Sequence, residues 1–299
     1  RVVRAAAGGV APLGAGGMVP QDVRAEAARE RAKGDVAAAG RGRKRNDMPV
    51  SETDILEKVK AGRKITGDDT LTPGYRGEVV RLMTIFVDTE LAWVSEYADQ
   101  INGAPGIRER VVAARIVAEK LDHAQRVLTL LEGFGVNPEL YVRSHAWTAR
   151  LDRSVNLGTR QVGDDKRLNV LHYPIQGWTD SVTMNALFGP ATIIHLTEVA
   201  NCSHAALAEA MAGILERERE HAEAAIKGLR QAVERDGSPA AAQVAVDYWY
   251  PRIADTFGRS DSTRYEQYRA YGLRQHTNAD LLATWKQDVA PILTAMGLR

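Results

Sequence analysis

From Gly74 onward the chain carries apolar residues every three or four positions in long segments, which short stretches rich in Gly and Pro separate. This spacing follows the turn of an α-helix, so each segment is expected to bury one face of a helix. The alternation of apolar and polar residues that marks a half-buried strand is nearly absent. We therefore predict helices at about residues 76–100, 107–133, 174–200, 203–237, 240–257 and 265–298.

The lengths of the connections predict how these helices are arranged. Short turns follow the first and third segments, so each of these two helices is expected to pack antiparallel to its successor. Residues 137–173 form a longer connection between the two pairs, similar to the crossover of a ferritin-like bundle. The predicted fold class is all-α, a ferritin-like four-helix bundle with additional C-terminal helices.

The N-terminal residues differ from the rest of the chain in composition. They are rich in Ala, Gly and Arg and contain few large apolar side chains, too few to offset the entropy of ordering. We expect residues 1–50 to be a disordered N-terminal segment and residues 51–299 to be the ferritin-like helical domain. The basic run at 41–45 leaves two other interpretations open, a transit peptide and a basic arm that binds nucleic acid. Several acidic residues and the lack of Ser argue against both.

Polar residues interrupt the apolar seams of the long helices near their middle. They are Glu90, Lys120, His123, Glu218 and His221. A charge alone in an apolar core costs several kcal/mol, so these groups must be paired or bound to metal if they face inward. Glu90 and Lys120 are 30 residues apart, a step that brings two positions to one level of an antiparallel pair. We predict that all five groups converge at mid-bundle. A solvated Glu-x-x-His face and a histidine buried for packing alone are the alternatives.

Four of these residues match part of a di-iron site. Such a site in a helical bundle takes a carboxylate from each of two helices and a Glu-x-x-His pair, one turn apart, from each of the other two. Glu218 and His221 form one Glu-x-x-His pair, Glu90 supplies a single carboxylate, and His123 supplies the histidine of the second pair. These four are the candidate metal ligands, and no residue is assigned a catalytic role.

The two remaining ligand positions carry other residues. Lys120 stands three residues before His123, where the second pair should have its acid, and Gly189 stands where the third helix should supply a carboxylate. An ammonium at Lys120 could hold the carboxylates together in place of a metal, without redox chemistry. Glu119 is the possible substitute ligand, because it lies four residues before His123 and close to it around the helix. Gly189 has no comparable substitute.

Composition narrows the classes of partner. The chain has 39 basic and 38 acidic residues, a formal net charge of +1, and gives no general electrostatic reason to bind nucleic acid or a membrane surface. It has one cysteine, which excludes an internal disulfide framework and fits a reducing compartment. No apolar run reaches the roughly 18 residues of a membrane span. We expect a cytoplasmic protein.

Extended stretches of the sequence over most of residues 73–299 resemble the catalytic subunit of the phenylacetyl-CoA epoxidase family. They run from the N-terminal end of the first long helix to the C-terminal helices. The similar stretches are Gly74-Tyr75-Arg76, Asp88-Thr89-Glu90, Asp122-His123, Tyr173-Pro174, Trp178-Thr179-Asp180, Tyr248-Trp249-Tyr250-Pro251-Arg252, Asn278-Ala279-Asp280-Leu281 and Met296-Gly297-Leu298.

The resemblance implies a component of a multicomponent, ring-epoxidising monooxygenase in phenylacetate catabolism. It implies an oligomer with related ferritin-like subunits, a reductase partner, an aromatic acyl-CoA substrate and iron as cofactor. The family places a Glu at the position of Lys120 and an Asp at that of Gly189, which puts iron binding in doubt. The alternative is a metal-free structural pseudo-enzyme that scaffolds a catalytic partner, as the related scaffolding subunit of the epoxidase complex does.

Overall fold

The computed structural model describes residues 51–299, and the predicted disorder of residues 1–50 lies outside the described part. Within that part the regular structure is helical, apart from an isolated bridge between Ile65 and His204. The prediction of an all-α fold is confirmed. The elements are α2 (Glu52–Lys60), α3 (Pro73–Gln100), η1 (Ile101–Gly103), α4 (Ile107–Glu132), α5 (Pro138–Arg143), η2 (Asn169–His172), α6 (Gly177–Ala200), α7 (Ala205–Asp236), α8 (Ala240–Ala254), η3 (Asp255–Phe257), α9 (Arg264–Ala270) and α10 (Asn278–Thr294).

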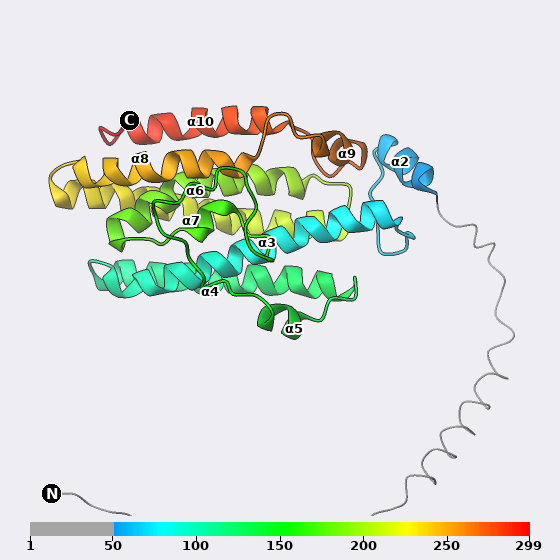
Figure 1. Cartoon of the computed structure of the whole chain (residues 1–299), viewed down its shortest axis with the longest axis horizontal. Coiled ribbons are helices and arrows are strands. Elements are labelled where there is room, and N and C mark those ends of the chain that lie inside the picture. Colours follow the sequence, from blue (N-terminus) through cyan, green and yellow to red (C-terminus); the bar gives the residue numbers. More distant parts are fainter. Residues whose placement is uncertain (1–50) are drawn as a thin grey trace, which may run out of the picture. The chain divides into compact units, whose positions relative to one another are not determined.

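Helices α3, α4, α6 and α7 form the ferritin-like bundle (Figure 1). Helix α3 packs on α4 and α6 packs on α7, as the short turns predict, and α4 also packs on α7. The residues between α4 and α6 cross over with only the short helices α5 and η2. Helices α8 and α10 pack along α6, on the side of the bundle away from α4 (Figure 1).

Helix ends follow local signals in the sequence. Thr72 caps α3 by accepting a hydrogen bond from the Tyr75 backbone, and Pro73 occupies the first turn, where no donor is lost. The helix predicted at 265–298 is wrong, because the structure has two helices there, α9 and α10. Gly272 adopts a left-handed φ of 64°, which ends α9, and Thr277 starts α10 with a capping box.

The core consists of two apolar clusters that share the long helices. One cluster contains Trp249 and Trp285, and the other contains Tyr75, Met83 and Met211. Along α3, α4 and α7, the residues of one cluster precede those of the other, and a short polar stretch lies between them on each helix. The bundle is therefore apolar at both ends and polar at one intermediate level. That level contains the polar residues predicted from the helix seams.

Candidate metal centre

Three helices bring the polar seam residues together in the interior. Glu90 comes from α3, Lys120 and His123 from α4, and Glu218 and His221 from α7. All five are between 2% and 8% exposed. The two apolar clusters flank this level, so the side chains cannot reach bulk water and must satisfy one another.

The Lys120 ammonium lies between the two carboxylates. Its Nζ donates to Glu218, at 2.8 Å from Oε1 and 2.9 Å from Oε2, and to Glu90, at 3.1 Å from Oε1 and 3.3 Å from Oε2. The same Nζ lies 4.9 Å from the centre of the Trp93 ring, whose electron-rich face adds a cation–π contact. One positive charge therefore bridges two buried negative charges from different helices.

His123 completes this group. Its Nδ1 lies 3.1 Å from Glu218 Oε1 and 3.8 Å from Glu90 Oε2. One ligand atom each of Glu90, His123 and Glu218 lies within 4.8 Å of the others, close enough to hold a single metal ion. The Lys120 ammonium already satisfies both of the carboxylates that such an ion would need.

The ionisation of the centre follows from burial and mutual attraction. Burial alone would lower the pKa of Lys120, but the Glu218 and Glu90 carboxylates outweigh burial and raise it. Burial likewise acts to raise the pKa of Glu218, yet Lys120, His123 and His221 hold it well below its usual value. Burial would also lower the pKa of His123, but its hydrogen bond to Glu218 and the nearby Glu90 carboxylate raise it. Lys120 stays protonated and Glu218 ionised at neutral pH.

His221 and Glu119 form a separate pair beside the centre. His221 Nε2 lies 2.6 Å from Glu119 Oε2. Since an ionised carboxylate only accepts, Nε2 carries the proton in this pair. His221 Nδ1 lies 3.3 Å from Glu218 Oε1 without a formed hydrogen bond. Glu119 therefore contacts His221 and lies outside the group of Glu90, His123 and Glu218.

Gly189 marks a close approach of α6 to α7. A Cβ atom added at Gly189 would lie 2.7 Å from Ala222 Cβ and 3.0 Å from Ala222 Cα, closer than non-bonded carbon atoms pack. The adjoining cavity, which Lys120, Glu218 and His221 also line, has a volume of about 20 Å³, room for about one water. At the level of the centre, helix α6 therefore presents no carboxylate and has no space for one.

The residues at this level do not fit a pair of iron ions. An ammonium occupies the position between the carboxylates, α6 contributes no ligand, and Glu119 is engaged by His221. A di-iron site needs carboxylates from all four helices. The donor set fits a single cation, and Lys120 supplies that cation from the chain itself.

Asp88 is a positioning residue that the seam pattern does not single out. It is fully buried; its Oδ1 accepts a hydrogen bond from the Tyr141 hydroxyl at 2.7 Å, and its Oδ2 accepts one from the Lys166 backbone at 2.6 Å. These bonds tie α5 and the crossover to α3 two residues from Glu90. The stretch Asp88-Thr89-Glu90 was the available signal, but only the structure shows what Asp88 contacts.

His195 on α6 lies outside the centre, and burial makes it sensitive to acid. Its Nε2 is buried without a hydrogen-bond partner among residues 51–299. Burial, with the nearby charge of Arg274, lowers its pKa to about 3. The ring is neutral in the folded protein but is protonated in the unfolded chain below about pH 6.5. Its contribution to stability is complete above that pH and is lost as the pH falls toward the folded-state pKa.

We expect His195 to lower the free energy of unfolding by about 2 kcal/mol at about pH 5, at about 1.4 kcal/mol per pH unit. Urea denaturation at neutral and acidic pH measures this loss. The loss should be smaller in His195→Phe, which keeps an aromatic ring against Phe257. Equal losses in both proteins would show that another group causes the acid sensitivity.

The fold and the centre define a ferritin-like helical protein with a carboxylate–histidine cluster in its core. A model of the family described as phenylacetic acid catabolic protein matches residues 48–299, so the chain belongs to this family, and the resemblance seen in the sequence is confirmed at that level. Membership connects the chain with phenylacetic acid catabolism. No curated protein matches it. Within residues 51–299, the helices all lack the combination of length and apolarity needed to cross a bilayer.

Proposed function

We propose that this chain is a metal-free component of a phenylacetyl-CoA epoxidase-like multicomponent monooxygenase. The observation that carries the proposal is the position of Lys120 Nζ, within hydrogen-bonding distance of both Glu90 and Glu218. Family membership supports the setting, aromatic acyl-CoA catabolism. The chain would act as a scaffold for a related ferritin-like subunit that performs the oxidation.

The ion network explains how the core persists without iron. Two buried carboxylates repel each other, and in a di-iron protein the metal supplies the compensating charge. Here the Lys120 ammonium supplies one positive charge, His123 adds a hydrogen bond to Glu218, and Trp93 shields the ammonium. None of these groups changes oxidation state, so electrons from a reductase would pass to the catalytic partner.

A catalytic role is the second candidate, and one observation favours it. Ligand atoms of Glu90, His123 and Glu218 are close enough to hold one metal ion if Lys120 withdraws. In that case Glu90, His123 and Glu218 would be the ligands, with His221 beside them. The chain would then bind its acyl-CoA substrate itself.

Metal analysis separates the two roles. Protein purified with excess ferrous iron should contain less than about a tenth of an iron per chain, and its melting temperature should be the same with and without chelator. The matched variant Lys120→Glu removes the internal cation and supplies the acid of a second Glu-x-x-His pair. It should retain more iron than the native chain and lose stability in chelator. Native protein with one or two irons per chain would refute the metal-free role.

A further inference from the structure

A mainly apolar pocket lies beside the centre, outside the ion network. Its volume is about 200 Å³, somewhat more than an apolar cavity of about 150 Å³ that accommodates benzene. Glu90 and Thr89 line it on the side of the centre, so it reaches the polar level of the bundle. Its apolar wall comes from α3, α6, η3 and the segment after α9 and consists of Leu82, Ile85, Phe86, Leu196, Val199, Phe257 and Leu273.

Two buried side-chain nitrogens on this wall have no hydrogen-bond partner among residues 51–299. They are His195 Nε2 and Arg274 Nη2. Arg274 uses its other terminal nitrogen, Nη1, to donate to Asn278 Oδ1 at 2.7 Å. A buried donor left without an acceptor costs about 1–3 kcal/mol, and more when it is charged. Both nitrogens belong to one pocket, so an acceptor bound there would satisfy Arg274, and also His195 in the tautomer that carries the proton on Nε2.

The acidic groups of the pocket are already engaged. Glu198 accepts hydrogen bonds from the Gln275 and His276 backbones, at 2.7 Å and 2.9 Å, and lies 2.7 Å from His276 Nδ1. Glu90 is bound to Lys120. The charge of Arg274 reaches the pocket wall, since after burial it is the second cause of the lowered pKa of His195. The unpaired polar groups of the pocket are thus two nitrogens, Arg274 Nη2 and His195 Nε2, and Glu198 faces the charge of Arg274 without a hydrogen bond to it.

We propose that this pocket binds a small monocarboxylate with an apolar body about the size of a benzene ring. Its carboxylate would accept hydrogen bonds from Arg274 Nη2 and His195 Nε2 after small side-chain rotations, and its body would contact Phe86 and Phe257. Arginine favours this acceptor, because a guanidinium–carboxylate bond is charge-assisted. The assignment goes beyond the scaffold role and does not depend on whether the centre holds iron.

Titration calorimetry with benzoate and with its neutral isostere benzamide tests the proposal on the native chain. Benzoate should bind with a dissociation constant in the millimolar range or below, and benzamide at least about tenfold more weakly. Arg274→Met should weaken benzoate binding by about tenfold or more. Val199→Phe, which places a ring in the pocket, should abolish it. The matched control is Arg264→Met on α9, since Arg264 pairs with Glu78 and does not line the pocket.

Three results would overturn the assignment. Native protein that does not bind benzoate at millimolar concentration has no such site. Equal affinity for benzoate and benzamide would show an apolar cavity without carboxylate recognition, and this comparison needs no variant. Binding that Arg264→Met weakens as much as Arg274→Met would reflect the general positive charge of the surface.

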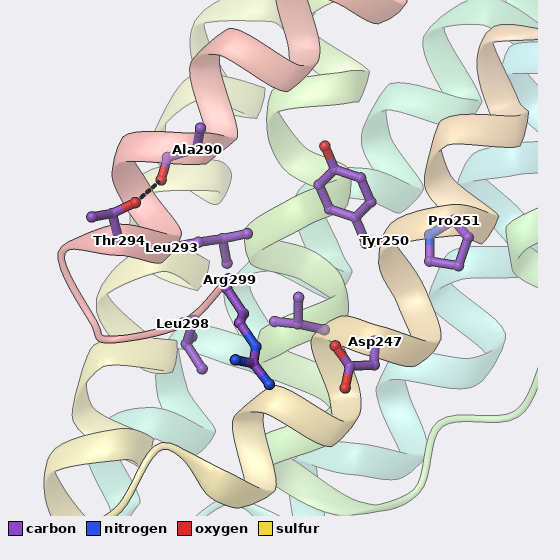
Figure 2. A pocket seen from close by; sticks show the side chains of 9 residues that line it. Asp247, Tyr250, Pro251, Ala290, Leu293, Thr294, Leu298 and Arg299 are labelled. Carbon is purple, nitrogen blue, oxygen red and sulfur yellow. Dashed lines mark hydrogen bonds between the residues drawn. The ribbon is translucent and has the colours of Figure 1, made fainter.

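A larger pocket on another side of the described part offers no comparable set of unpaired nitrogens. It lies between α8 and α10, has a volume of about 420 Å³ and is lined by Tyr250, Leu293 and Arg299 among others (Figure 2). Thr294 Oγ1 on its rim donates to the Ala290 carbonyl at 2.9 Å. Its lining atoms do not include the orphaned buried donors found among residues 51–299.

Discussion

Replacing Lys120 by methionine should lower the free energy of unfolding by about 3–5 kcal/mol, the usual cost of removing one partner from a buried ion pair. Methionine nearly fills the volume of the lysine stem, so the loss isolates the charge. Without the ammonium, the carboxylates of Glu90 and Glu218 face each other in a site that is 2% exposed at each. Urea denaturation at neutral pH measures the change.

Two further proteins make this result specific to the centre. Arg126→Met removes an ion pair with Asp122 on the same helix, in which both side chains are 54% exposed, and should cost less than about 0.5 kcal/mol. The triple variant Glu90→Gln, Lys120→Met, Glu218→Gln removes all three charges and should recover much of the loss. If Lys120→Met costs no more than Arg126→Met, the buried ion network does not form.

Gly189→Asp should destabilise the protein by about 3 kcal/mol, at the upper end of the cost of overpacking. Any side chain at this position starts with a Cβ atom 2.7 Å from Ala222 Cβ. Helix α6 must therefore move away from α7, and the packing around Phe188 and Ala222 is disturbed along with it. Thermal and urea unfolding of the variant measure the loss.

The compensating change is on the facing helix. Ala222→Gly removes the contacted methyl and should by itself cost about 1 kcal/mol through lower helix propensity. Combined with Gly189→Ala, it should give a protein more stable than Gly189→Ala alone. Building the full ligand set of a di-iron site should accordingly need Lys120→Glu, Gly189→Asp and Ala222→Gly together. A tolerated Gly189→Asp single variant would show that α6 and α7 are not held at this spacing.

The helices and the inward residues could be predicted because they depend on local, periodic patterns. Glu90, flanked by Val87 and Val94 on one stripe, and Lys120, three residues before His123, are positions that the helical period alone assigns to the interior. The 30-residue step between Glu90 and Lys120 also placed them at one level correctly, because a short antiparallel connection leaves little freedom. The ligand roles themselves stay predictions.

The remaining features depend on contacts between elements distant in sequence. From the sequence, Gly189 is interpreted as a missing ligand. Its close approach to Ala222 can be seen only in the packing of α6 against α7. Glu119 has the helical position of a substitute ligand, but His221 on another helix engages it. The break before α10 follows from the left-handed Gly272, where a Cβ atom would lie 2.8 Å from Val59. The helical period of a sequence carries no information about contacts between elements that are distant along the chain.

The polar level between the two apolar clusters has a consequence for how the helices slide past one another. An axial shift of one helical turn would bring apolar side chains against other apolar surface, which costs packing but buries no unpaired polar group. One turn away from Glu90 on α3 and from Glu218 on α7, there is no second pair of carboxylates that the Lys120 ammonium could bind. A shift of about 5.4 Å would therefore strand three charges. The ion network thus fixes the axial alignment of α3, α4 and α7, and this structural role requires neither iron nor oxygen.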